Sequence, residues 1–298
     1  MNRLLRGIAV VAFSLLAGFV GADEIAVHQN LTYAEIGDTK LQLDLAMPKD
    51  GDGPFPGIVF IHGGGWSGGN RHAFRGKIEE AARRGYVAAT ISYRLTQPDK
   101  ETGTPKEPFP AQIHDCKAAI RWLRAHAGEY KLDRDRIGVI GASAGGHLSL
   151  LVGLSSKEDG LDGDEGNLSY SSRVQAVVNI FGPTDLVRCY ESSPGAVGFL
   201  KALCNGTPES AAAAYRSASP VTYITTDDPP VLTLHGDKDA LVPPEQATIL
   251  DERLKAAGVK HELKLLADQG HGFRGDAAQE ADDAAWSFFD RYLKPSKN

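Results

Sequence analysis

Cysteine is scarce in this chain, and the cysteines that occur form no metal-binding pattern. Cys116, Cys189 and Cys204 occur singly, with no CxxC pair or Cys/His cluster around any of them. Such clusters supply the ligand spacing of structural zinc sites. The count of 3 is odd, so at least one thiol must stay unpaired within the chain. The sequence therefore predicts no metal site and one disulfide at most.

Basic runs are also missing. The 298 residues include 32 Lys and Arg against 38 Asp and Glu, which gives a formal net charge of -6. No stretch gathers the Lys and Arg residues that bind phosphate backbones, so we expect no nucleic-acid partner. Hydrophobic residues make up 42% and charged residues 23%, a composition typical of a folded globular protein rather than a disordered one.

The chain has one notable apolar run, at its N-terminus. Arg3 and Arg6 precede the run 8–20, and small residues follow it. This order predicts that residues 1–22 are a secretory signal peptide. A transmembrane helix needs about 20 apolar residues, more than this run supplies, although an uncleaved anchor is the alternative. We therefore expect a secreted or periplasmic protein whose mature part, 23–298, has no stable membrane insertion.

Strands and helices alternate along that mature part. The predicted strands are 31–36, 41–46, 57–61, 86–92, 136–140, 174–180, 230–235 and 261–266, and the predicted helices are 73–84, 110–127, 144–154, 244–257 and 278–293. Such alternation predicts one α/β domain, a mostly parallel, doubly wound sheet with helices on both faces. The first two strands favour an antiparallel edge pair. Segment 183–216 has weak strand and helix signals, and we expect it to be a small cap insertion.

Residues 141–145 read Gly-Ala-Ser-Ala-Gly, which fits G-x-S-x-G. The motif lies between a predicted strand and the predicted helix 144–154, the context of a nucleophile elbow. The glycines permit a sharp turn that exposes the hydroxyl of Ser143, and the helix N-terminus favours developing negative charge. The motif therefore predicts a nucleophilic serine. His147, one helical turn beyond it, is expected to be a packing residue.

Residues 62–66 read His-Gly-Gly-Gly-Trp and directly follow the strand 57–61. This is the position of the HGGG-type loop that supplies oxyanion-hole donors. The backbone N–H groups of Gly64, Gly65 and Ala144 are the predicted donors. One such donor stabilises a transition state by about 3 kcal/mol. His62 is expected to brace the loop rather than act as a base.

An acid and a base follow the last two predicted strands. His271 lies in a Gly-His-Gly-Phe sequence, and Asp239 lies in the preceding acidic loop, where Asp237 is a competing candidate. A serine hydroxyl is a weak nucleophile and needs a base such as neutral His271, which a carboxylate orients. We favour Asp239 because it lies farther into the loop. The catalytic triad Ser143, Asp239 and His271 then needs no cofactor.

The pocket and the cysteines complete the expectations. Trp66 and Phe181 lie beside these motifs and are predicted to bind substrate. Cys189 and Cys204 share the cap segment, and export would keep a bridge oxidised, so we predict that they form a disulfide. Cys116 falls in an amphipathic helix and is predicted to be a free, buried thiol.

With these motifs the sequence resembles the α/β-hydrolase superfamily. It looks closest to secreted bacterial esterases of the acetylxylan or feruloyl esterase-like kind, within a wider group similar to hormone-sensitive lipase and kynurenine formamidase. The matching pieces span nearly the whole mature chain and are 62–66, 92–95, 109–123, 141–148, 181–185, 235–243 and 270–273. The resemblance implies a serine carboxylesterase for small-molecule or polysaccharide-linked esters, including acetyl or feruloyl esters of plant polysaccharides. It also implies an ion pair between Arg94 and Asp115.

A serine peptidase is the alternative. The catalytic domains of prolyl oligopeptidases share the GxSxGG elbow and the HGDxD acid loop that this sequence contains. Those enzymes usually carry a large N-terminal propeller, and too few strands precede His62 for blades of four strands each. The His-Gly-Gly-Gly-Trp loop also favours an esterase. One fold hosts many acyl-transfer activities, so the resemblance predicts the fold more specifically than it predicts the substrate.

Overall fold

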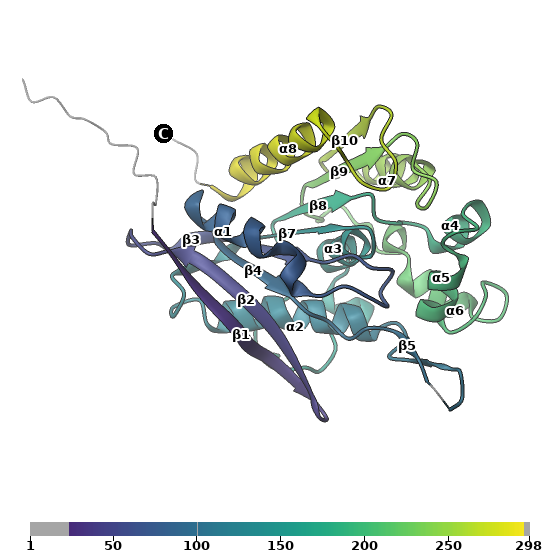
Figure 1. Cartoon of the computed structure of the whole chain (residues 1–298), viewed down its shortest axis with the longest axis horizontal. Helices are drawn as coiled ribbons and strands as arrows, with labels where there is room; N and C mark the ends of the chain where they lie inside the picture. The colour runs from purple at the N-terminus through teal and green to yellow at the C-terminus, as the bar shows by residue number, and fades with distance from the viewer. Residues whose placement is uncertain (1–23, 100, 295–298) are drawn as a thin grey trace, which may run out of the picture.

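The computed structural model describes residues 24–99 and 101–294, and a mixed sheet runs through the middle of this part of the chain (Figure 1). Its strands are β1 (Ile25–Ile36), β2 (Thr39–Pro48), β3 (Phe55–Ile61), β4 (Val87–Ile91), β7 (Leu132–Ala142), β8 (Ala176–Ile180), β9 (Val231–Gly236) and β10 (His261–Leu266). A separate short hairpin pairs β5 (Gln97–Pro98) with β6 (Pro105–Lys106). The predicted signal peptide, 1–22, lies outside the described residues.

The sheet has eight strands in the order β1-β2-β4-β3-β7-β8-β9-β10. The pairs β1–β2 and β2–β4 are antiparallel, and the strands from β4 to β10 are parallel. The predicted edge pair and the predicted α/β-hydrolase fold are therefore confirmed. Ligand sites on such sheets lie beyond the carboxyl ends of the parallel strands.

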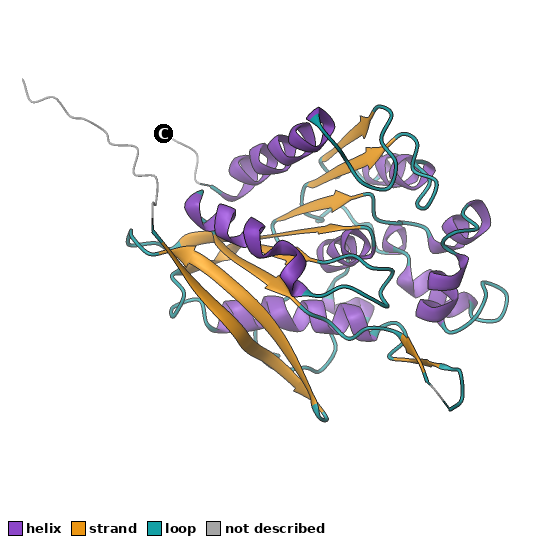
Figure 2. Cartoon of the chain, in the orientation of Figure 1, coloured by secondary structure: helices purple, strands orange, loops and turns teal. Residues whose placement is uncertain are grey.

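Helices flank the sheet on both faces, as Figure 2 shows in purple. They are α1 (Arg75–Arg83), α2 (Ala111–Ala125), α3 (Ala144–Leu154), α4 (Leu186–Ser192), α5 (Val197–Cys204), α6 (Ala212–Ala218), α7 (Glu245–Ala256) and α8 (Asp276–Leu293). Short 3-10 turns occur at Arg71–Phe74, Lys157–Asp159 and Pro220–Thr222. None of the described helices combines the length and the apolar character that crossing a bilayer requires.

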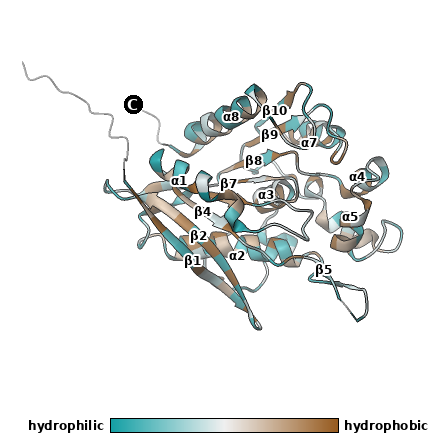
Figure 3. Cartoon of the chain, in the orientation of Figure 1, coloured by the Kyte–Doolittle hydropathy of each residue, from teal (hydrophilic) through white to brown (hydrophobic). Residues whose placement is uncertain are grey.

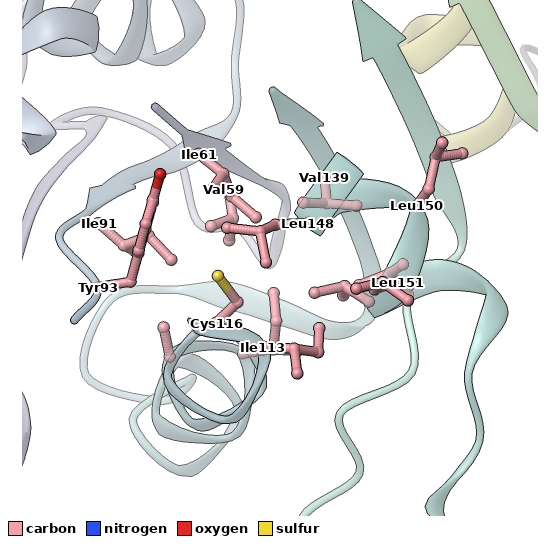
Figure 4. Close-up of a cluster of buried hydrophobic side chains, with 14 of the residues drawn as sticks. Val59, Ile61, Ile91, Tyr93, Ile113, Cys116, Val139, Leu148, Leu150 and Leu151 are labelled. Atoms are coloured by element: carbon pink, nitrogen blue, oxygen red, sulfur yellow. The ribbon is translucent and has the colours of Figure 1, made fainter. Parts of the chain in front are cut away.

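Two apolar layers hold the helices to the sheet. Strand β3 shows why its sequence is a continuous apolar run: Val59 and Ile61 join the layer under α2 and α3, whereas Ile58 and Phe60 join the layer under α1 and α8. A strand buried on both faces needs no polar alternation. In Figure 4, Val59 and Ile61 lie close to Cys116 of α2 and Leu148 of α3. Figure 3 shows the hydrophobic residues concentrated along the strands.

The segment 183–216 contains α4, α5 and most of α6, and we call it the cap. Figure 1 shows it at the side of the molecule where β7 and β8 end. The cap is therefore helical although its sequence signals are weak, and each of these helices has only 7 or 8 residues. Isolated helices of this length are unstable in water, so their stability must come from packing.

The predicted disulfide in the cap is corrected by the structure. Cys189 and Cys204 are free thiols, each buried within its own helix, α4 or α5. Burial raises the pKa of both thiols to about 12, so the reactive thiolate is disfavoured. Apolar packing therefore explains both residues without a bridge. Cys116 is a free, buried thiol, as predicted.

Candidate active site

Ser143 occupies a strained turn between β7 and α3. Its backbone has φ +57° and ψ -122°, a left-handed region that a residue with a side chain rarely adopts. The Ser143 N–H donates a hydrogen bond of 2.8 Å to the carbonyl of Ile180 at the end of β8. Neighbouring backbone therefore fixes the elbow in place.

Two glycines make this turn possible through close backbone approach. A Cβ atom on Gly145 would lie 2.0 Å from the Ile61 carbonyl oxygen. A Cβ atom on Gly141 would lie 2.3 Å from the carbonyl oxygen of Gly145. Both distances are shorter than any real contact, and the neighbouring atoms are backbone that cannot move aside. The two glycines of the G-x-S-x-G motif are therefore steric requirements of the elbow.

Ser143, His271 and Asp239 form one hydrogen-bonded chain, although they come from loops after β7, β10 and β9. The Oγ of Ser143 lies 2.8 Å from Nε2 of His271, and Nδ1 of His271 lies 2.7 Å from Oδ2 of Asp239. A carboxylate only accepts, so Nδ1 carries the hydrogen and Nε2 is left to accept the serine proton. The sequence-predicted triad residues are thus brought together in the geometry that general-base activation requires.

The Asp239 carboxylate is buried and fully engaged. Its Oδ1 accepts hydrogen bonds of 2.9 Å from the N–H groups of both Leu241 and Val242. Burial opposes ionisation, but the nearby His235 and His271 and the Val242 N–H outweigh it and hold the pKa of Asp239 below its usual range. The competing acid, Asp237, is exposed to solvent.

His235 is a positioning residue that sequence reasoning missed. Its Nε2 lies 2.8 Å from the carbonyl oxygen of Val242 and 3.6 Å from Oδ2 of Asp239. The carbonyl can only accept, so Nε2 carries the hydrogen and donates it. His235 is completely buried and closes the turn that presents Asp239. A histidine at the end of an apolar strand, four residues before the acid, was the available signal.

The glycine loop presents free donors. Gly64 and Gly65 have positive φ values of +117° and +58°. The N–H groups of Gly64, Gly65 and Ala144 donate to no other group among the described residues, and all three residues line one cavity. Three unsatisfied donors beside a nucleophile suit a developing oxyanion.

His62 braces that loop, as expected. Its Nδ1 lies 2.8 Å from the Gly63 carbonyl oxygen, and its ring stacks on Tyr93 at 4.3 Å between centroids. The Tyr93 hydroxyl donates to the His62 carbonyl at 2.9 Å. Burial lowers the pKa of His62, which keeps the ring neutral.

A cavity of about 410 Å³ opens beside Ser143. The loop and elbow residues form one side of it, together with the predicted substrate-binding residues Trp66 and Phe181. The remaining lining is apolar, and most of it comes from the cap: Pro183, Cys189, Ala196, Phe199, Leu200, Leu241 and Val242. Among the described residues, no Asp, Glu, Lys or Arg side chain lines the cavity, and Ser143 and His271 are its most polar members. Such a cavity suits an uncharged, apolar group.

Trp66 and Phe181 have fixed positions. The Phe181 ring packs 4.7 Å from the His271 ring. The Trp66 indole N–H donates to Nδ1 of His147 at 3.1 Å, and Nε2 of His147 donates to the Ala218 carbonyl at 2.7 Å. Burial lowers the pKa of His147 to about 4. The predicted packing role of His147 is confirmed, and it links the glycine loop to the end of α6.

Metal ligation is not indicated in the described part of the chain. No group of three or more His, Cys, Asp or Glu side chains gathers there in a way that could hold a metal ion. The site therefore brings together a serine hydroxyl, a histidine, a carboxylate and free N–H donors, which are the groups that acyl transfer through a serine requires.

Comparisons with known proteins agree with this geometry. Residues 43–254 match the profile of the BD-FAE family. Esterase LipC of Mycobacterium tuberculosis is 33% identical over 289 residues, covering 88% of this chain and 69% of LipC. A bifunctional GH43-CE protein of Bacteroides eggerthii superposes with a TM-score of 0.76 at 32% identity, over 89% of this chain but 38% of that protein.

A second solved structure aligns over nearly its whole length. The thermophilic esterase Est2 of Thermogutta terrifontis superposes with a TM-score of 0.74 at 28% identity, covering 93% of this chain and 96% of Est2. Est2 has also been solved with propionate bound, with butyrate bound and phosphonylated by sarin. The chain thus aligns over most of its length with proteins described as esterases.

Proposed function

Because the chain belongs to the BD-FAE family and is a carboxylic ester hydrolase of the α/β-hydrolase fold, we propose that Ser143, His271 and Asp239 are its catalytic triad. The observation that carries this proposal is the hydrogen-bonded chain from Ser143 through His271 to Asp239, with distances of 2.8 Å and 2.7 Å, beside three free N–H donors. We further propose that the substrates are acetyl or feruloyl esters of plant polysaccharides.

The reaction proceeds through an acyl-enzyme. The Ser143 Oγ attacks the ester carbonyl carbon while Nε2 of His271 takes its proton, and Asp239 stabilises the resulting imidazolium. The N–H groups of Gly64, Gly65 and Ala144 receive the oxyanion. When the tetrahedral intermediate collapses, the carbon–oxygen bond to the alcohol breaks and His271 returns the proton to the departing oxygen. Water then repeats these steps on the acyl-enzyme, which releases the acid and restores Ser143.

The choice of acyl group is supported by the cavity lining. Uncharged side chains form almost all of it, so burying a charged acyl group there would cost desolvation without compensation. Acetyl and feruloyl groups both lack a formal charge and meet this requirement. The similarity to a GH43-CE protein supports an alcohol that is part of a carbohydrate.

A substrate panel tests the proposal. We expect the purified enzyme to hydrolyse aryl acetates together with acetylated xylan or methyl ferulate, and to leave peptide p-nitroanilides intact. Release of acid from the aryl ester alone would reject the polysaccharide assignment. Cleavage of the p-nitroanilides without ester turnover would establish the peptidase alternative.

We also propose that the protein is exported and that the signal is removed after Ala22, on the strength of the N-terminal sequence pattern. N-terminal sequencing of the protein from the periplasm or medium should begin at Asp23. A start at Met1 in the membrane fraction would instead indicate an anchor.

A further inference from the structure

Phe199 of the cap packs directly on the oxyanion loop. The side chain is 40% exposed, which makes it one of few large hydrophobic residues at the surface of the described chain. It also lines the active-site cavity. A Cβ atom on Gly65 would lie 2.4 Å from Cδ1 of the Phe199 ring, so the ring covers the face of Gly65. The exposed part of the Phe199 side chain therefore lies at the opening of the active-site cavity.

Helix α5 holds this ring in a fixed position. Leu200 and Leu203 on the same helix are each 1% exposed and anchor it in the core. The Leu203 carbonyl accepts a 2.9 Å hydrogen bond from the Phe109 N–H, which ties the end of α5 to the main domain. Before α5, the Ser193 hydroxyl donates to the Leu241 carbonyl at 2.7 Å. The Phe199 ring is thus held against the cavity by a helix that packs in the core, and it is not a loosely attached surface side chain.

The chemistry of the site separates the acyl side from the alcohol side. The carbonyl oxygen must point to the free N–H groups, and the departing oxygen must lie within reach of Nε2 of His271. The alcohol side of the site is therefore the side of His271, whose ring packs against Phe181. The acyl chain must take the remaining direction, away from His271 and past Gly65, where Phe199 lies.

We propose that Phe199 is a specificity-determining residue that limits the length of the acyl chain, so that short acyl groups are preferred and, of the two acyl groups proposed above, acetyl is favoured over feruloyl. The inference rests on the proposed function, because it requires an acyl-enzyme on Ser143. The ring fills space next to Gly65 that a longer chain would need. Removing the ring enlarges the acyl side, and enlarging the ring narrows it.

Two substrate series test this assignment. The first keeps p-nitrophenol as the alcohol and compares acetate with octanoate; the second keeps acetate and compares phenol with 2-naphthol. In Phe199→Ala, the octanoate-to-acetate ratio of kcat/KM should rise by about tenfold or more, since each buried methylene contributes to discrimination. In Phe199→Trp the ratio should fall. The naphthyl-to-phenyl ratio should stay within about twofold in both variants.

A matched control is Leu168→Ala, which removes another exposed hydrophobic residue, 54% exposed and outside the cavity lining. It should leave both ratios unchanged. If Phe199→Ala does not fold, Phe199→Leu and Phe199→Trp still decide, because they must move the acyl ratio in opposite directions. An acyl ratio that stays constant, or a shift confined to the alcohol series, overturns the proposal.

Active-site titration separates this inference from the proposed function. Diethyl p-nitrophenyl phosphate should release one p-nitrophenolate per wild-type chain and per Phe199 variant as it phosphorylates Ser143. Normal titration with an unchanged acyl ratio would reject only the role of Phe199. Failure of the wild-type enzyme to be titrated would reject the serine mechanism, and the Phe199 assignment with it.

Discussion

The active site and the charged cluster beside α2 are both buried and polar, yet they are built in opposite ways. In the cluster, the Arg94 guanidinium lies 2.6 Å from Asp115 and 2.9 Å from Glu165, so the predicted Arg94–Asp115 ion pair is confirmed. Lys117 lies 2.7 Å from Asp162, although its own side chain is completely buried. These charges face one another across α2 and the chain that follows α3.

Arg121 extends the cluster by donating to three backbone carbonyls, those of Asp162, Glu165 and Gly166, at 2.6 to 3.1 Å. Its donors are thereby used to fix the loop around residues 162–166. In the active site, by contrast, three N–H donors are left free and Ser143 is held in a strained turn. The difference shows that saturated buried charges stabilise a loop, whereas unsaturated donors remain available to a reacting group.

Removing the nucleophile should produce the largest effect. Ser143→Ala is expected to lower kcat by about 10⁶-fold, because the remaining groups have nothing to activate. The thermal unfolding temperature should not be lowered, since within the described part of the chain the hydroxyl hydrogen-bonds only to His271. Appreciable hydrolysis of an aryl acetate by a variant free of contaminating esterase would contradict the nucleophilic role of Ser143.

Replacing the orienting acid should come next. Asp239→Asn should lower kcat by about 10⁴-fold, because an amide favours the wrong tautomer of His271. Asp237→Asn is the matched control at an exposed carboxylate in the same loop, and it should change kcat/KM by less than about twofold. Steady-state kinetics of both variants measure these losses. A larger loss in Asp237→Asn than in Asp239→Asn would assign the role of the acid to Asp237.

Breaking the charged cluster should cost stability rather than catalysis. Asp115→Ala leaves the Arg94 guanidinium without its closest partner, and we expect a loss of about 3–5 kcal/mol in the free energy of unfolding. Glu35→Gln, at an exposed ion pair with Lys40, should cost less than about 0.5 kcal/mol. Urea unfolding measures both, and kcat/KM of folded Asp115→Ala should match the wild type. A large fall in kcat/KM would show that the two regions are coupled.

The smallest effect concerns His147 and depends on pH. Its pKa is about 4 in the folded protein and ~6.5 in an unfolded chain, so the unfolded state binds the proton more tightly. Stability is therefore lost as pH falls from ~6.5 to about 4, by up to about 3 kcal/mol. His147→Gln retains one donor and one acceptor but does not titrate. The free energy of unfolding of His147→Gln, measured in urea, should change less between pH 7 and pH 4.5 than that of the wild type. Equal changes in the variant and the wild type would contradict this.

Local sequence predicted the elements whose residues are set by local demands. The helix 144–154 and the strand 261–266 have the predicted bounds, because a G-x-S-x-G turn and an alternation of polar and apolar residues are readable from neighbouring residues. The loops that carry Ser143 and Asp239 follow strands whose ends are apolar and buried, which is also readable locally. Chain order then suggested which residues meet, and the sheet brings them together at one edge.

The cap could not be predicted in the same way. Helices α5 and α6 have no side-chain cap at their N-termini, so nothing local marks where they begin. The predicted disulfide was wrong because two cysteines close in sequence do not reveal whether each one is buried in its own helix. Phe199 was missed because its partner, Gly65, lies far away in the sequence. Such contacts arise only from tertiary packing.

Because the elbow is so crowded, residues 141–145 tolerate far fewer substitutions than the exposed part of the cap. With a prospective Gly145 Cβ only 2.0 Å from backbone, any other residue there displaces the strand that carries the glycine loop. A library randomised at residues 141–145 should therefore yield almost only inactive clones. One randomised at the exposed positions of α5, Gly198, Phe199 and Lys201, leaves the strained turn and the core untouched and should retain many active clones. Substrate range can consequently diverge among relatives while the elbow motif stays constant.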